Sequence, residues 1–84
     1  MEIREEKAAI IGIFIKDFDA VPKVNGILHD YAEDIIGSIR IPCRDRDLHL
    51  ISIILSTTPD RISALSGKLG RIEGITAKAM QANL

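Results

Sequence analysis

The chain has 84 residues, which is enough for one domain and too few to divide between two hydrophobic cores. A hydrophobic share of 46% and a charged share of 27% are typical of a folded globular protein and exclude a disordered chain. Eleven lysines and arginines oppose twelve aspartates and glutamates, so the formal net charge of −1 provides no global positive field for nucleic acid or an anionic membrane.

The first half of the chain predicts a strand, a helix and a second strand. Residues 1–7 are polar and are expected to form a flexible N-terminal segment. Residues 8–16 are rich in β-branched side chains and are bounded by charge, as in a buried strand. Asp19 is expected to cap a helix that has Pro22 in its first turn and ends near residues 31–33. Residues 35–42 predict a strand whose Pro42 suits the edge of a sheet.

The second half repeats this order after a charged hairpin loop at residues 43–47. Residues 48–57 predict a strongly apolar strand, and Thr58 and Pro59 are a capping residue and a first helical residue. Gly70 and Gly74 mark the end of that helix, residues 75–80 predict a last short strand, and residues 81–84 are expected to be a tail. We therefore expect one domain over residues 8–80.

A shift of 41 residues aligns the two halves, with Ile10 on Ile51 and Ile13 on Ile54. The apolar stripes of the two helices coincide fully: Val21, Val24, Leu28 and Tyr31 against Ile62, Leu65, Leu69 and Ile72. Two β-α-β units in tandem predict an α+β fold, the ferredoxin-like βαββαβ sandwich. In this fold a four-stranded, antiparallel-type sheet carries both helices on one face, and the first and third strands are central.

Because alternate residues of a strand face opposite sides, each central strand divides into two sets. The set predicted to face the helices is Ile10, Gly12, Phe14, Ile51, Ile53 and Leu55. The set predicted to face away from the helices is Ile11, Ile13, Ile15, Leu50, Ser52, Ile54 and Ser56. This second set would leave five large aliphatic side chains in water, although burying each is worth about 1.5–3 kcal/mol. We therefore predict that it is an oligomer interface covered by a second copy of the chain; the alternative is that both strands are simply central and weakly patterned.

The residues that could carry chemistry are few. Cys43 and His49 flank the same hairpin loop and are the candidate metal ligands, but no pair of residues has zinc-site spacing, so no metal is expected unless a neighbouring subunit adds ligands. Cys43 with His29 or His49 is the one thiol–imidazole option for catalysis, and a domain of this size offers little room for a pocket. We expect no catalytic residues and no enzyme.

Asp17, Asp19 and Asn25 surround the first strand–helix turn, where they are either caps and solvated turn residues or the border of a small-molecule site at a subunit interface.

The predicted outward face carries no aromatic side chain on which bases could stack, so direct nucleic-acid binding is not expected. Residues 1–7 are charged and only eight residues lie between Lys7 and Lys16, so we expect neither a signal peptide nor a membrane span. A single cysteine is typical of a reducing compartment, which predicts a cytoplasmic location.

The segment SGKLG at residues 66–70, followed by Ile72, Gly74 and Ile75, resembles the family of iron-only hydrogenase system regulators. The resemblance extends to Leu28-His29 and Ile41-Pro42 and covers roughly residues 8–80. It implies a ferredoxin-like fold related to ACT domains and to the C-terminal domain of the nickel-responsive regulator, relatives that assemble through their sheets.

The resemblance also implies a bacterial regulatory or ligand-sensing role, with either a small-molecule effector or a separate regulatory protein as partner. It identifies no cofactor. The nickel-responsive regulator binds its metal with several histidines and a cysteine, whereas only Cys43 and His49 lie in the corresponding region here. We therefore expect a non-enzymatic, homo-oligomeric module, a dimer or tetramer. The alternatives are a metal sensor built on those two residues across subunits and a small enzyme with an intersubunit site.

Overall fold

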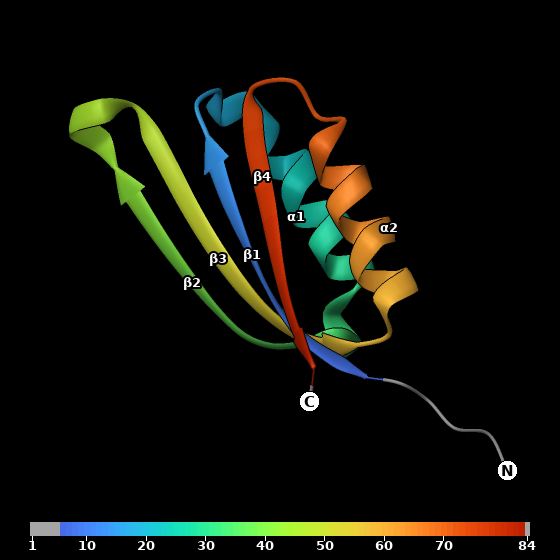
Figure 1. Cartoon of the computed structure of the whole chain (residues 1–84). Helices are drawn as coiled ribbons and strands as arrows, with labels where there is room; N and C mark the ends of the chain where they lie inside the picture. The colour runs from blue at the N-terminus through green and yellow to red at the C-terminus, as the bar shows by residue number, and fades with distance from the viewer. Residues whose placement is uncertain (1–5, 84) are drawn as a thin grey trace, which may run out of the picture.

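Four antiparallel strands form one sheet in the computed structural model, which describes residues 6–83 (Figure 1). The elements in chain order are β1 (Lys7–Ile15), α1 (Val21–Asp30), β2 (Ile35–Cys43), β3 (Leu48–Thr57), α2 (Pro59–Gly70) and β4 (Ile75–Asn83). Short 3-10 turns, η1 (Phe18–Ala20), η2 (Ala32–Asp34) and η3 (Arg44–Arg46), join some of them. The strand order β2-β3-β1-β4 confirms the α+β ferredoxin-like topology with β1 and β3 at the centre.

Both ends of the domain extend further than the sequence predicted. Lys7 pairs with Thr57 and is the first residue of β1, not part of a flexible segment. Gln81 pairs with Ala9, and β4 runs to Asn83, so residues 81–83 are not a tail. A strand can extend as far as its neighbour offers ladder partners, and β1 offers them along its whole length. Residues 1–5 and Leu84, where the rest of the expected segment and tail would lie, are outside the described residues.

The two helices begin in different ways. The hydroxyl of Thr58 accepts a hydrogen bond from the Arg61 N–H at 3.4 Å, and Pro59 is the first helical residue, as predicted. Before α1 the cap is Asp17, not Asp19: its carboxylate accepts from the Asp19 N–H at 3.0 Å and closes η1. The three residues of η1 then lead into α1, so the first strand–helix connection is longer than the second.

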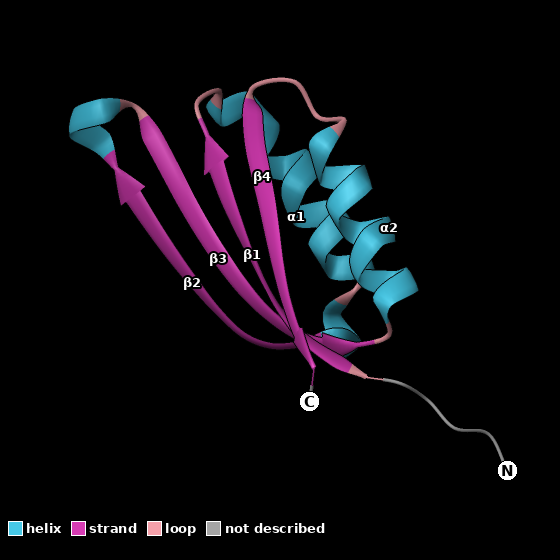
Figure 2. Cartoon of the chain, viewed as in Figure 1, coloured by secondary structure: helices cyan, strands magenta, loops and turns pink. Residues whose placement is uncertain are grey.

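The core lies between the helices and one face of the sheet. Its buried side chains come from β1 (Ala9, Ile11, Ile13, Ile15), β3 (Ile51, Ile53, Leu55), α1 (Val24, Leu28) and α2 (Ile62, Leu65, Leu69), with Ala20 and Tyr31 beside α1. The predicted helical stripes are confirmed, since Val24, Leu28, Leu65 and Leu69 are buried. Figure 2 shows both helices on one side of the sheet.

The predicted face assignment is wrong for β1. Ile11, Ile13 and Ile15 are at most 1% exposed beneath the helices, whereas Ile10 and Phe14 are 42% and 44% exposed on the opposite side. In an antiparallel pair, residues directly opposite each other share a face, and Ile11 lies opposite Ile53. The buried strand positions therefore repeat after 42 residues (Ile11 and Ile53), while the helices repeat after 41 (Val24 and Leu65). The longer first connection accounts for the one-residue difference.

Candidate functional site

The side of the sheet that turns away from the helices exposes several large apolar side chains, and we call it the open face. Its members are Gly37, Ile39 and Ile41 of β2; Leu50, Ser52, Ile54 and Ser56 of β3; Ala8, Ile10, Gly12 and Phe14 of β1; and Thr76, Lys78, Met80 and Ala82 of β4. Six large apolar members are between 38% and 67% exposed: Ile10, Phe14, Ile39, Ile41, Ile54 and Met80. Lys78 is the one charged residue among them.

The structure retains only part of the expected interface. Leu50, Ser52, Ile54 and Ser56 lie on the open face, as predicted. Ile11, Ile13 and Ile15 do not, because they fill the core, and Ile10, Gly12 and Phe14 take their place. Phe14, which the sequence predicted to face the helices, therefore adds an aromatic side chain to the open face.

The edge strands also contribute to the open face, and none of their residues was among those predicted for the interface. Ile39 and Ile41 flank Arg40, and this apolar–polar–apolar alternation in β2 is a signal that places both isoleucines on one face. Met80 of β4 lies opposite Ile10 of β1, and only the register between the two strands shows that they are neighbours.

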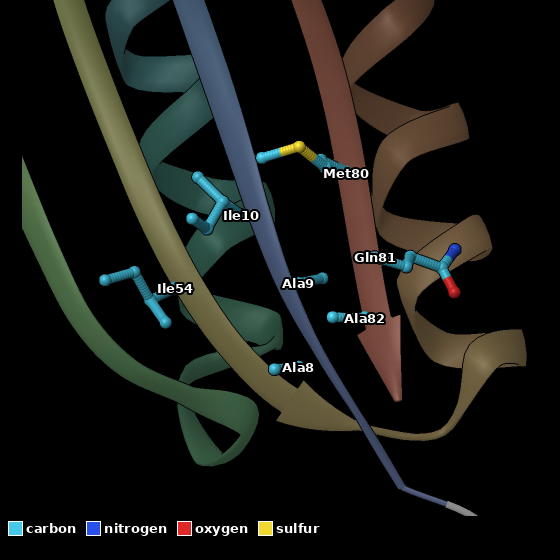
Figure 3. Close-up of a pocket in the computed structure, with 7 residues that line it drawn as sticks. All are labelled: Ala8, Ala9, Ile10, Ile54, Met80, Gln81 and Ala82. Carbon is cyan, nitrogen blue, oxygen red and sulfur yellow. The ribbon is translucent and has the colours of Figure 1, made fainter. Parts of the chain in front are cut away.

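A shallow hollow of about 280 Å³ lies at one end of the open face. Ala8 and Ala82 form its floor, and Ile10, Ile54 and Met80 rise beside it (Figure 3). The amide of Gln81 extends toward the other side of the sheet in the same view. The hollow is lined almost entirely by apolar side chains, so its shape and surface suit an apolar side chain.

Of the three residues predicted to border a ligand site, Asp17 and Asp19 share a hydrogen bond, and Asn25 has a separate partner. Asn25 accepts a hydrogen bond from the Arg40 guanidinium of β2 at 2.7 Å. Asp17 caps η1 and packs against Gly74, just before β4. Asp19 is exposed in η1. Because β2 and β4 are opposite edges of the sheet, Asn25 and Asp17 are anchored to different edges, and a ligand shared by the three residues stays a prediction.

The candidate metal ligands lie on opposite faces of the hairpin. Cys43 pairs with Leu48, and His49 pairs with Pro42, so their side chains point to opposite sides of the sheet and cannot share a metal within one chain. The His49 ring meets Phe18 edge to face at a centroid distance of 6.3 Å, and its Nε2 is buried without a hydrogen-bond partner. No group of three or more potential ligands occurs among residues 6–83. His29 lies in the last turn of α1, on an exposed surface.

A cationic cluster ties α2 to the end of α1. Arg61 donates from Nε to the Asp34 carboxylate at 2.6 Å, and its guanidinium lies 4.9 Å from the centroid of the Tyr31 ring. The Lys68 ammonium is 5.0 Å from the same ring. The hydrogen bond to Asp34 raises the pKa of Arg61 above its ordinary value, so this side chain stays charged at any pH at which the protein is handled. These contacts link α2 to the residues that follow α1.

No helix in the described part of the chain is long and apolar enough to cross a membrane.

Among solved structures, the uncharacterized protein TM1266 from Thermotoga maritima superposes with a TM-score of 0.89 at 35% identity, over 94% of this chain and all of that one. The ACT domain of GTP pyrophosphokinase from Chlorobium tepidum gives a TM-score of 0.71 at 18% identity, over 94% and 90% of the two chains. The C-terminal domain of MgtC from Mycobacterium tuberculosis gives 0.70 at 14% identity, over 99% and 95%.

The last two similarities show the fold alone, which is that of an ACT-like domain. No curated protein matches the sequence. Residues 7–79 match the family model described as "TM1266-like: Iron-only hydrogenase system regulator, putative". That match spans β1 to β4 and agrees with the resemblance seen in the SGKLG segment. The chain therefore belongs to the TM1266-like family of iron-only hydrogenase system regulators.

Proposed function

We propose that the protein is a non-enzymatic, ligand-sensing regulatory module that works as a homo-oligomer in the cytoplasm and associates through the open face. The family description supports a regulatory role linked to iron-only hydrogenase systems. The ACT-like fold supports action by binding. The single cysteine suits a reducing compartment.

The open face is the observation that carries this proposal. It combines six exposed, large apolar side chains with a single charge, a composition that resembles the core of an interface rather than a solvated sheet surface. The ordinary arrangement for such a sheet is a polar outer face, with the apolar side chains turned toward the helices. A second copy of the chain would remove these side chains from water.

The size of the open face fits such a contact. Four strands of about nine residues, roughly 4.8 Å apart and rising about 3.3 Å per residue, span a flat area on the order of 500 Å². Side chains that stand up from this area increase its accessible surface, which approaches the roughly 800 Å² per partner of a standard protein interface.

Light scattering coupled to size exclusion tests the proposal on the wild-type chain and on Ile54→Lys. Ile54 lies at the centre of the open face and is 38% exposed, so a lysine there can reach water in a monomer and is buried only when a second copy docks. We expect the wild type to elute as an oligomer at micromolar concentration and Ile54→Lys to elute as a folded monomer.

Phe18→Lys is the matched control, because Phe18 is 47% exposed and belongs to η1 outside the open face. It should leave the assembly unchanged. A wild type that remains monomeric would contradict the proposal, and equal dissociation by the two lysine variants would show that the interface is elsewhere.

A further inference from the structure

Gly12 is placed where the chain itself has no need of a glycine. It lies in the middle of the central strand β1, and its φ is not in the left-handed region. A Cβ built there would meet nothing closer than the Phe14 ring at 4.0 Å, an ordinary contact. Glycine weakens a strand interior, and in such positions it often marks the close approach of another segment. The structure supplies no such segment among residues 6–83, since Gly12 faces outward on the open face.

The open face is organised in rows that cross the strands. One row holds Ile10 and Ile54, and the next holds Gly12 and Ser52. Beyond the first row lie Ala8 and Ser56, and beyond the second lie Phe14 and Leu50. Along both central strands the rows therefore alternate between small and large side chains.

This alternation has one consequence for packing two copies. Reversing the direction of β1 about the point midway between Ile10 and Gly12 exchanges a large side chain for a small one at each of the four positions that β1 contributes to the open face: Ile10 with Gly12, and Phe14 with Ala8. The same reversal in β3 exchanges Ile54 with Ser52 and Leu50 with Ser56. A surface with this property is complementary to itself under a two-fold axis.

We propose that two copies pack their open faces together about a two-fold axis that crosses the strands between the Ile10 and Gly12 rows, so that Ile10 of each copy lies over Gly12 of the other and Phe14 fills the hollow above Ala8. This inference rests on the proposed function, because it assumes that the open face is the self-association surface. The strands of the two sheets run antiparallel across the interface, within the roughly 30° rotation of an aligned β-sandwich.

Other two-fold arrangements fit less well. An axis along the strands would place each row on the same row of the other copy. Isoleucines would then meet isoleucines, and the two Gly12 rows would leave a gap between the sheets, although interfaces are close-packed like protein interiors. An axis shifted by one row towards Phe14 would set Ile54 against Leu48, which follows Leu50 on this side of β3, so two large side chains would meet. The proposed axis is the one that lets the four rows of the central strands overlap with large side chains on small ones.

One pair of positions in each edge strand agrees with this arrangement. In β2 the reversal sets Ile39 over Gly37, another large side chain on a small one. In β4 it sets Met80 over Lys78. Lys78 lies in an edge strand, so its aliphatic stem can pack under the methionine while its ammonium reaches water at the rim.

A size swap tests the register. Gly12→Ile should collide with Ile10 of the other copy, and we expect the dissociation constant of the assembly to rise by at least about tenfold. The double variant Ile10→Gly/Gly12→Ile should restore self-association to within about threefold of wild type, because the large side chain and the space that receives it have exchanged places in both copies. Analytical ultracentrifugation measures each constant, and circular dichroism checks that every variant is folded.

The matched control is Gly67→Ile, the same substitution on the exposed side of α2, where a Cβ meets nothing within 4 Å. It should leave the dissociation constant unchanged. If a β1 variant does not fold, the swap Ser52→Ile/Ile54→Ser in β3 asks the same question, with Ser52→Ile alone as the disruptive variant.

The outcomes separate the two proposals. A monomeric wild type overturns the proposed function and this inference with it. A wild type that assembles, is dissociated by Ile54→Lys and is indifferent to Gly12→Ile keeps the open face as the interface and overturns the register. Dissociation by Gly12→Ile without restoration by the double variant overturns the register as well.

Discussion

Gly74 shows how a single residue fixes the end of the sheet where α2 returns to β4. Its φ is +85°, and a Cβ there would lie 2.6 Å from the Asp17 Cβ. Its carbonyl oxygen accepts hydrogen bonds from the Lys16 and Asp17 N–H groups at 2.9 and 3.3 Å. We therefore expect Gly74→Ala to lower the free energy of unfolding by about 1–3 kcal/mol. Gly67→Ala should raise it by up to about 1 kcal/mol, because that helical glycine has open space around it.

Urea denaturation at a fixed protein concentration measures both glycine variants, and a Gly74→Ala protein as stable as Gly67→Ala would contradict the strain argument. Both glycines lie in or shortly after the SGKLG segment, and that pattern does not show how much the fold depends on each of them. Only the backbone angle and the neighbouring Asp17 distinguish a required glycine from a tolerated one.

Thr57 is a second residue whose role depends on the structure. It is 1% exposed at the end of β3, and its hydroxyl has no hydrogen-bond partner. Because an unpaired buried hydroxyl is costly, we expect Thr57→Val to raise the free energy of unfolding by about 1 kcal/mol. Thr57→Ala should not reproduce this gain, since it also removes a buried methyl group. Loss of stability in the valine variant would show that the hydroxyl has a partner.

At the scale of elements, the sequence predicted the strand and helix order and the helix faces, because the 3.6-residue stripes and the glycine and proline signals are local. Local patterns could not show which residues of β1 face the helices and which face away from them. Both alternate sets of β1 are apolar, so periodicity alone does not select one, and the 41-residue repeat selects the wrong one. The extra residues of η1, which no local pattern marks, shift the strands relative to the helices by one position. The candidate site was affected for the same reason, since its β1 members changed from Ile11, Ile13 and Ile15 to Ile10, Gly12 and Phe14.

Two neighbouring isoleucines of β1 test this face assignment directly. Ile11 is fully buried under the helices, and Ile10 is 42% exposed on the open face. In the Ile54→Lys background, where self-association is expected to be absent, Ile11→Ala should lower the free energy of unfolding by about 2–5 kcal/mol. Ile10→Ala should lower it by less than about 1 kcal/mol. Equal losses in chemical denaturation would contradict the observed strand orientation.

At the scale of the whole molecule, the sheet is apolar on both sides, and the helices bury only one of them. The helices cover one side with Val24, Leu28, Ile62, Leu65 and Leu69, and the described chain offers nothing comparable for the other. A domain of 84 residues has a small core and correspondingly little stability to spare. Part of its stability should therefore come from the second copy, which makes folding and assembly linked equilibria.

That linkage predicts a melting temperature that depends on protein concentration. At concentrations above the dissociation constant of a dimer, each tenfold increase in protein concentration adds about 0.7 kcal/mol per chain to the free energy of unfolding. For a domain of this size, this raises the melting temperature by about 3–6 °C. Differential scanning calorimetry of the wild type over a hundredfold range should show this rise, while Ile54→Lys should melt at one temperature throughout. A wild-type midpoint that does not move would mean that the open face contributes nothing to the stability of the folded chain, because an interface that buries these side chains must be populated by mass action.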